Sequence, residues 1–230
     1  MQTLIFELRG SIAHFRRPDT TAAHLTYPFI TRTALRGLLG SILGLDEFHG
    51  EAWTGVELVE PVRTRSQELS LLGKGFVDNE GSSTFNRPTS VELVVQPHYR
   101  IYYQGEHLNE LAERIRRRQS VYHTYLGSAF ALTVPEYVDL VLAESIVGTG
   151  SIQCLTVVPE KAIAALHPVP GVQYARVNAM LHQHIGQRRF RGSMDIIYEV
   201  NGRPITLDVH EADHILYRFV RVPQGVVCLW

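Results

Sequence analysis

The sequence contains little cysteine and no long hydrophobic run, and each shortage excludes a class of protein. Only two of its 230 residues are cysteines, Cys154 and Cys228, and they form no CxxC pair. This excludes a disulfide framework or a cysteine-rich zinc site, so each is expected to be a small buried apolar residue. No apolar run approaches the ~20 residues that cross a membrane. The first residues, MQTLIFELRG, lack the basic and apolar regions of a signal peptide. We therefore expect a cytoplasmic protein without membrane contact.

Common catalytic and cofactor motifs are also missing. The glycines of GLLGSILGL are not followed by Lys and Ser or Thr, so they form no phosphate-binding P-loop. GTGS is too short for a dinucleotide fingerprint, and GSMD is not a nucleophile elbow. His182 and His184 could share one face of a strand, but no carboxylate or third histidine follows at a matching spacing. We expect no cofactor, no metal and no catalytic residue.

The charge is distributed unevenly although the net charge is only −1. Residues 9–40 contain five arginines and one aspartate, and residues 176–192 contain four arginines and no acid. The acidic residues gather elsewhere, for example at Glu136, Asp139 and Glu144. A polarised surface of this kind is typical of a protein with one anionic partner and other, protein-facing sides.

The first half of the chain predicts alternating strands and helices. Residues 4–12 alternate as a strand does, and residues 14–28 read as a loop with two prolines. A helix is expected to begin near Thr31 or Thr33. Its core-facing stripe has the spacing i, i+3, i+4, i+7, i+8, at Leu35, Leu38, Leu39, Ile42 and Leu43.

The elements that follow complete a recognisable order. Residues 56–62 and 90–103 favour strands, residues 105–119 a second helix, and residues 122–143 further short strands. The predicted order is β-α-β-β-α-β, the ferredoxin-like or RRM-type unit, in an α+β fold. We expect a domain over residues 1–145 with a long thumb-like β-hairpin at about 65–88. The remaining residues, 146–230, predict a β-rich C-terminal region.

The strongest functional signal is the pairing of arginines with aromatic rings. Residues 14–17, HFRR, place rings beside guanidinium planes, and residues 187–191, QRRFR, repeat this theme. Single-stranded RNA is bound by such groups, through stacking of bases and through cations on phosphates. Arg32 and Arg36 lie one turn apart on the helix side away from Leu35. These clusters favour an RNA-binding protein over a metabolic enzyme.

Three stretches resemble the CRISPR-associated protein five family, the RAMP-type subunit at the foot of type I Cascade complexes. They are the opening strand with FRRP and TYPFITRTALRGLLGSILGL, then NRPTSVELVVQPHYRIYY, and then YHTYLGSAFAL. The first looks like the family's signature loop and first helix, and the second like the strand that returns from its thumb. The resemblance covers roughly residues 1–140, and its pattern is most similar to type I-B subunits.

The resemblance implies a structural role in an RNA-guided complex. Such subunits bind the 5′ handle of the CRISPR RNA, cap the filament of backbone subunits and dock the large subunit, and the assembled complex binds target DNA. It implies RNA contacts at Phe15, Arg16, Arg17, Arg32, Arg36 and Arg87. Composition alone adds Arg188, Arg189 and Arg191.

Catalysis is the main alternative. One branch of the family, in type I-C systems, trims the guide precursor with Tyr, Lys and His. An adjacent Lys-His pair is missing here, because the only lysines are Lys74 and Lys161 and neither precedes a histidine. The expectation is therefore a non-catalytic subunit. The alternatives are a metal-independent endoribonuclease, which could use His14, Tyr27 and His123, and a scaffold whose main partners are proteins.

Overall fold

The structure of the protein is a computed structural model. It describes residues 1–20, 23–73, 85–148, 150–187, 189–210 and 216–230, and for residues 72–73 and 85–87 the backbone only. The chain is strand-rich with two α-helices in this part, which confirms the predicted α+β class.

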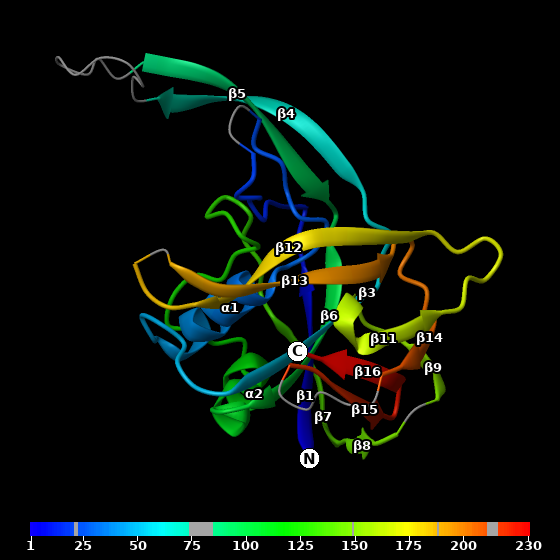
Figure 1. Cartoon of the computed structure of the whole chain (residues 1–230). Coiled ribbons are helices and arrows are strands. Elements are labelled where there is room, and N and C mark those ends of the chain that lie inside the picture. Colours follow the sequence, from blue (N-terminus) through cyan, green and yellow to red (C-terminus); the bar gives the residue numbers. More distant parts are fainter. Residues whose placement is uncertain (21–22, 74–84, 149, 188, 211–215) are drawn as a thin grey trace.

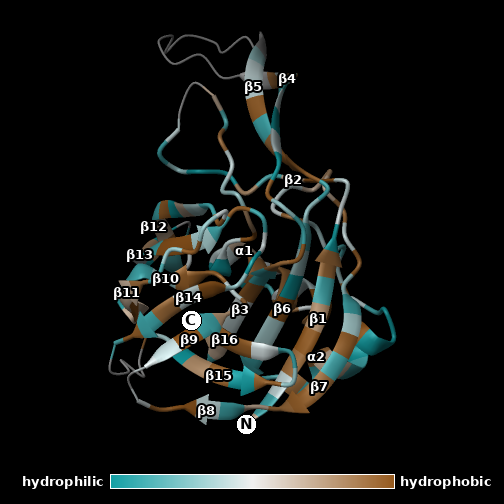
Figure 2. Ribbon diagram, turned by 90° about the vertical axis from the view of Figure 1, so that its right-hand side faces the viewer, coloured by the Kyte–Doolittle hydropathy of each residue, from teal (hydrophilic) through white to brown (hydrophobic). Residues whose placement is uncertain are grey.

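A four-stranded antiparallel sheet forms the centre of the molecule. Its strand order is β3-β6-β1-β7, and the strands stand side by side in Figure 2. Helix α1 lies between β1 and β3 along the chain, and α2 lies between β6 and β7. The bounds are β1 Gln2–Arg9, α1 Arg32–Leu43, β3 Ala52–Leu58, β6 His98–Gly105, α2 Leu108–Arg116 and β7 Glu136–Leu142.

Helix α1 begins and ends at residues suited to those positions. The side chain of Thr31 accepts a hydrogen bond from the Ala34 N–H at 3.2 Å, which satisfies one of the free donors of the first turn. Gly44 ends the helix in the left-handed conformation at φ 81°, and its N–H donates to the Gly40 carbonyl. The predicted apolar stripe is buried against the core, at Leu35, Leu38, Leu39, Ile42 and Leu43.

A long antiparallel hairpin rises from the body of the protein (Figure 1). It consists of β4, Thr64–Gly73, and β5, Phe85–Val95, paired from Thr64 opposite Val94 outward. The short strand β2, Ile12–Ala13, joins β5 at the base. The hairpin occupies the part of the chain where the sequence predicts a long excursion, and residues 74–84 lie outside the described residues.

The second half of the chain is β-rich, as the sequence predicts. Strands β12 and β13 form a second long hairpin, joined by β10, and six further strands form a sheet in the order β11-β14-β9-β16-β15-β8. A single 3-10 turn, Glu160–Ala162, is the one helical element described there. The bounds are β8 Glu144–Ile146, β9 Ser151–Cys154, β10 Val158–Pro159, β11 Ile163–Leu166, β12 Tyr174–His184, β13 Phe190–Glu199, β14 Ile205–Val209, β15 Arg218–Val222 and β16 Gly225–Leu229.

Both halves contribute to one hydrophobic core. Its main cluster runs from Leu4 in β1 to Trp230, and the Trp230 and Thr54 backbones exchange hydrogen bonds of 3.1 and 3.2 Å. Cys154 and Cys228 are free and buried, as predicted, and burial raises the pKa of both thiols. No helix in the described part of the chain is long and apolar enough to cross a membrane.

Candidate nucleic-acid interface

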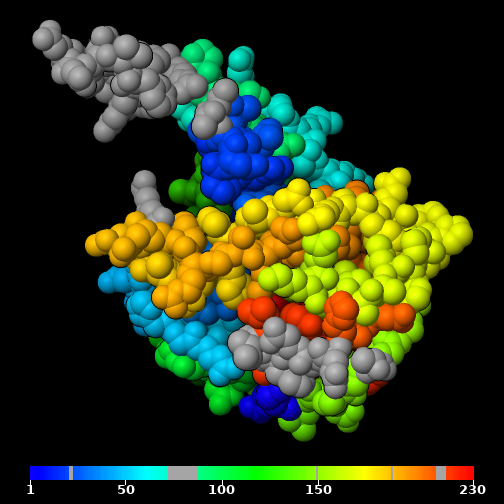
Figure 3. Space-filling model, viewed as in Figure 1, coloured from blue at the N-terminus to red at the C-terminus, as the bar shows by residue number. Residues whose placement is uncertain are grey.

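A groove of about 560 Å³ lies where four segments distant in sequence meet. Its walls are the loop of residues 14–28, the exposed side of α1, residues 45–49, and the β12–β13 hairpin. In Figure 3 the loop, in blue, lies directly above that hairpin, in yellow and orange. The rings and cations in the lining are Phe15, Arg16, Tyr27, Arg36, Phe48, His49, His184 and Phe190.

The loop is folded back on itself by backbone hydrogen bonds. Tyr27 N–H donates to the Phe15 carbonyl at 2.8 Å, Arg17 N–H donates to the Leu25 carbonyl at 2.9 Å, and Phe15 N–H donates to the Thr26 hydroxyl at 2.9 Å. This pairing turns Phe15 inward. The Phe15 side chain is 3% exposed and packs on Tyr99 with ring centroids 6.3 Å apart. The expectation that Phe15 offers a free ring for stacking is therefore wrong, although its edge borders the groove.

Arg16 and Arg17 differ in how much of their charge is available. Arg17 donates two hydrogen bonds to Asp19, at 2.6 and 3.1 Å, and this pairing raises the pKa of Arg17 and lowers that of Asp19. Arg16 donates only to carbonyls, those of Thr20 at 2.5 Å and Arg17 at 3.3 Å. Within the described residues no carboxylate pairs with Arg16. The charge of Arg16 is therefore more available to an anionic ligand than that of Arg17.

Arg32 does not face solvent. It is 9% exposed, and its guanidinium donates to the carbonyls of Ala52, His182 and Trp230 at 2.9 to 3.2 Å. Burial, with a smaller contribution from Arg36, lowers its pKa to about 10. The predicted outward orientation is wrong because Arg32, three and seven positions before Leu35 and Leu39, shares their buried face, where Ala52, His182 and Trp230 surround it. The geometry gives Arg32 a structural role.

Arg36 does line the groove. Its Nη2 atom donates to the carbonyls of Phe48 at 2.8 Å and Gly50 at 3.0 Å, and its guanidinium lies 5.0 Å from the centre of the Phe48 ring. Partial burial lowers its pKa. Its Nε and Nη1 donors have no hydrogen-bond partner among the described residues, so they are available to an anion.

The end of the β12–β13 hairpin carries the second basic and aromatic cluster. Arg189 and Arg191 are exposed and make no ion pair within the described part of the chain. Phe190 is 39% exposed and meets the His184 ring edge to face, with centroids 5.3 Å apart. Arg188 lies outside the described residues, and of Arg87 only the backbone is described, opposite Leu71 in the β4–β5 hairpin.

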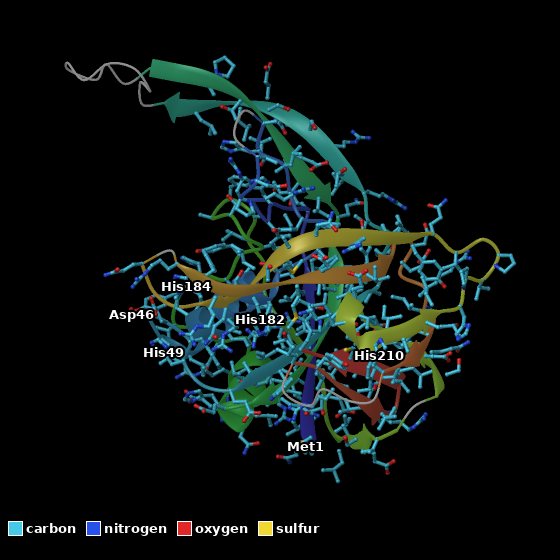
Figure 4. All side chains as sticks on the ribbon, viewed as in Figure 1. Met1, Asp46, His49, His182, His184 and His210 are labelled. Carbon is cyan, nitrogen blue, oxygen red and sulfur yellow. The ribbon has the colours of Figure 1, made fainter. Side chains whose placement is uncertain are left out.

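Sequence patterns did not predict the polar cluster at the mouth of the groove (Figure 4). The Glu47 carboxylate lies 3.6 Å from His49 Nε2 and 3.9 Å from His184 Nδ1. Asp46 precedes it in the lining. His184 comes from a strand more than a hundred positions later, so no local spacing could have predicted the cluster.

Of the two histidines in HQH, His182 is turned away from the groove. Burial, and then the charges of Arg32 and Arg36, lower its pKa to about 4, and its Nδ1 atom has no hydrogen-bond partner among the described residues. Within those same residues, no group of three or more His, Cys, Asp or Glu side chains is arranged to hold a metal ion.

Gly127 fixes the position of the loop and provides a stability test. Its φ is +80°, and a Cβ atom there would lie 2.2 Å from the His14 carbonyl oxygen. Gly127→Ala is expected to lower the free energy of unfolding by about 2–4 kcal/mol, measured by denaturant titration. Gly37→Ala is the control, because nothing lies within 4 Å of a Cβ there. It is expected to stabilise α1 by ~1 kcal/mol, and an equal loss in both variants would contradict the steric explanation.

The fold is similar to that of several solved structures. A "CRISPR RNA-guided surveillance complex" chain matches with a TM-score of 0.55, 13% identity, and coverage of 90% of this chain and 91% of that one. A CRISPR protein from Archaeoglobus fulgidus matches with a TM-score of 0.54, 10% identity, and coverage of 99% of both chains. A third structure, of a "Cas protein", has a TM-score of 0.53, 16% identity, and coverage of 87% and 95%.

The fold is therefore that of CRISPR-associated proteins. The family model described as "CRISPR-associated protein (Cas_Cas5)" matches residues 3–214. This chain belongs to that family, as the resemblance in the sequence predicts. The sequence matched no curated protein.

Proposed function

We propose that this protein is a non-catalytic RNA-binding subunit of a type I CRISPR effector complex, and that the groove binds the 5′ handle of the CRISPR RNA. The observation that carries the proposal is the groove itself, where cations without carboxylate partners lie beside rings. Arg16 and Arg36 come from its N-terminal walls, and Arg189 and Arg191 extend the positive surface along the β12–β13 hairpin. Guanidinium groups bind phosphates, and rings stack on unpaired bases.

The topology supports a finer assignment of the fold. The order β3-β6-β1-β7, with α1 after β1 and α2 after β6, supports a ferredoxin-like unit over residues 1–145. The β4–β5 hairpin would then be the thumb that bends the guide, with Arg87 on its returning strand. Residues 146–230 would add the β12–β13 wall, so that both regions build one RNA site.

Protein partners are part of the proposal. Large apolar side chains are exposed along one stretch that leads into the edge strand β7, at Val121, Tyr122, Tyr125, Phe130, Leu132, Val134 and Val138. A concentration of exposed apolar groups is typical of a surface that another protein covers. This surface would receive a neighbouring subunit of the complex, either the backbone subunit or the large subunit, while the complex as a whole binds target DNA.

The proposal predicts tight, selective binding without cleavage. We expect purified protein to bind an RNA that ends in its own repeat-derived 5′ handle about tenfold or more tightly than an RNA with that handle scrambled. Affinity is measured by fluorescence anisotropy at two salt concentrations, because phosphate contacts make binding salt-dependent. Equal affinity for both RNAs would contradict handle binding.

One observation favours the alternative of an endoribonuclease. Glu47 with His49 and His184 places a carboxylate and two imidazoles at the mouth of the groove, and two imidazoles can serve as base and acid in metal-free RNA cleavage. The candidates from the sequence are less suited, because His14 and Tyr27 are buried and His123 is exposed but does not line the groove. Incubating repeat RNA with the protein in EDTA decides between the two functions. Cleavage at one site that is lost in His49→Ala would overturn the non-catalytic assignment.

A further inference from the structure

Glu47 is out of place in a groove for a polyanion. Arg and Lys side chains in the lining of the groove are Arg16 and Arg36, whereas Glu47 and its neighbour Asp46 are acids. A carboxylate close to phosphates repels them, and it offers acceptors only. A carboxylate in such a place is useful when it accepts hydrogen bonds from something other than a phosphate.

The carboxylate oxygens of Glu47 are available to accept hydrogen bonds from a ligand. Its side chain is 41% exposed, and the two imidazoles stand at 3.6 and 3.9 Å, beyond normal hydrogen-bond distance. No other described residue donates a hydrogen bond to it. The carboxylate bridges two walls of the groove, because one oxygen is directed to His49 on its own segment and the other to His184 on β12.

A stacking surface lies beside this carboxylate. Phe190 has an exposed ring, and its contact with His184 places that ring next to the imidazole that faces Glu47. The free donors of Arg36 lie in the same groove. A volume of about 560 Å³ is large enough for a small ligand the size of one nucleotide. The groove thus combines a ring for a base, acceptors for the edge of a base and a cation for a phosphate.

The chemistry of the bases selects among the possible occupants. On its Watson–Crick edge, guanine presents two adjacent donors, N1–H and the N2 amino group, which match the two oxygens of one carboxylate. Adenine and cytosine present one amino group beside a ring acceptor, and uracil presents one N–H between two carbonyls. Proteins that read single-stranded RNA bind splayed-out bases on these edges.

We propose that the groove captures one unstacked guanine of the bound RNA, with Glu47 accepting from its N1–H and N2 amino groups and Phe190 stacking on its ring. This inference rests on the proposed RNA-binding function and deepens it by naming a specificity-determining residue. The Arg36 guanidinium, which lines the same groove, would contact a phosphate of the bound RNA.

Four short RNAs test the inference. Each is an eight-nucleotide oligouridine in which one central position is G, A, C or U, and each is titrated against the full-length protein. We expect the G-containing RNA to bind about tenfold more tightly than the all-U RNA, the discrimination that one good two-bond base contact provides. In Glu47→Ala the ratio should fall to about one. The affinity for the all-U RNA should be unchanged or higher, since a repulsive charge is removed.

Two controls separate base recognition from general electrostatics. Glu113→Ala removes a carboxylate from α2, outside the groove, and is expected to keep the G preference. Asp46→Ala removes the neighbouring acid, and loss of the preference there but not in Glu47→Ala would overturn the assignment to Glu47. Equal binding of all four RNAs by the wild type would overturn guanine capture and leave RNA binding intact. If the protein binds neither these four RNAs nor handle-bearing RNA, the proposed function itself would be overturned.

Discussion

Replacing Arg32 with methionine is expected to lower the free energy of unfolding by about 3–5 kcal/mol. Three carbonyls, from Ala52, His182 and Trp230, lose the Arg32 donor in this variant, and that of Trp230 keeps other donors, the Thr54 N–H and hydroxyl. Carbonyls that are buried without a partner retain their full desolvation cost. Since 1 kcal/mol shifts the Tm of a protein of this size by roughly 2–4 °C, the loss should appear as a Tm lower by about 6–20 °C. Thermal and denaturant unfolding measure the effect directly.

The control is a similar arginine on the surface. Arg114 is paired with Glu110 one turn away on α2, and Arg114→Met is expected to change stability by no more than about 0.5 kcal/mol. RNA affinity gives the second readout. A stable Arg32→Met protein with strongly reduced RNA binding would contradict the structural role and restore Arg32 as an RNA contact.

The double variant Arg16→Ala/Arg191→Ala is expected to weaken binding of handle-bearing RNA by about a hundredfold without loss of stability. Arg16 lines the groove and Arg191 lies next to the lining residue Phe190 on β13, so the groove and its border each lose an exposed cation. A charge-assisted hydrogen bond contributes roughly 1.5–3 kcal/mol, and 1.4 kcal/mol is tenfold in affinity. The slope of log affinity against log salt should fall by about 1.4, or about 0.7 for each phosphate contact with a single strand.

A matched pair of arginines outside the groove controls for net charge. Arg114→Ala/Arg117→Ala removes one cation from α2 and one from its C-cap, and both arginines pair with glutamates of that helix. This variant is expected to retain the affinity and the salt slope of the wild type. If the two double variants weaken binding equally, the attraction is a property of the whole surface and the groove is not the RNA site.

The apolar pattern of the sequence predicts local structure well. The stripe from Leu35 to Leu43 is buried as expected, and the caps at Thr31 and Gly44 define α1. Such features depend on residues within a few positions of one another, where helix geometry alone decides which side chains share a face. The β-rich character of residues 146–230 has the same local origin.

The candidate site was harder to predict because distant segments build it. Arg32 lies three and seven positions before Leu35 and Leu39, so helix spacing places it on the apolar face, but its acceptors Ala52, His182 and Trp230 come from distant segments. From the sequence, Phe15 is expected to be an exposed ring in a loop. The backbone hydrogen bond between Phe15 and Tyr27 instead turns its side chain into the core. His184 and Glu47 have no sequence relationship that could have predicted their approach. The sequence indicated which segments carry the arginines of the groove. Burial and pairing, which depend on the fold, decide which of these arginines remain available to RNA.

The hydrogen bonds of Arg32 also have a consequence for folding kinetics. Two of its three acceptors, the carbonyls of His182 and Trp230, lie 150 and 198 positions later in the chain. The guanidinium near the start of α1 can form these hydrogen bonds only when nearly the whole polypeptide has been made. Proteins with many contacts of such long range fold slowly. During synthesis on a ribosome, α1 and β3 are completed well before the strands that cover them. We expect the last strands to close the core in a late, cooperative step, and the RNA groove to form only then.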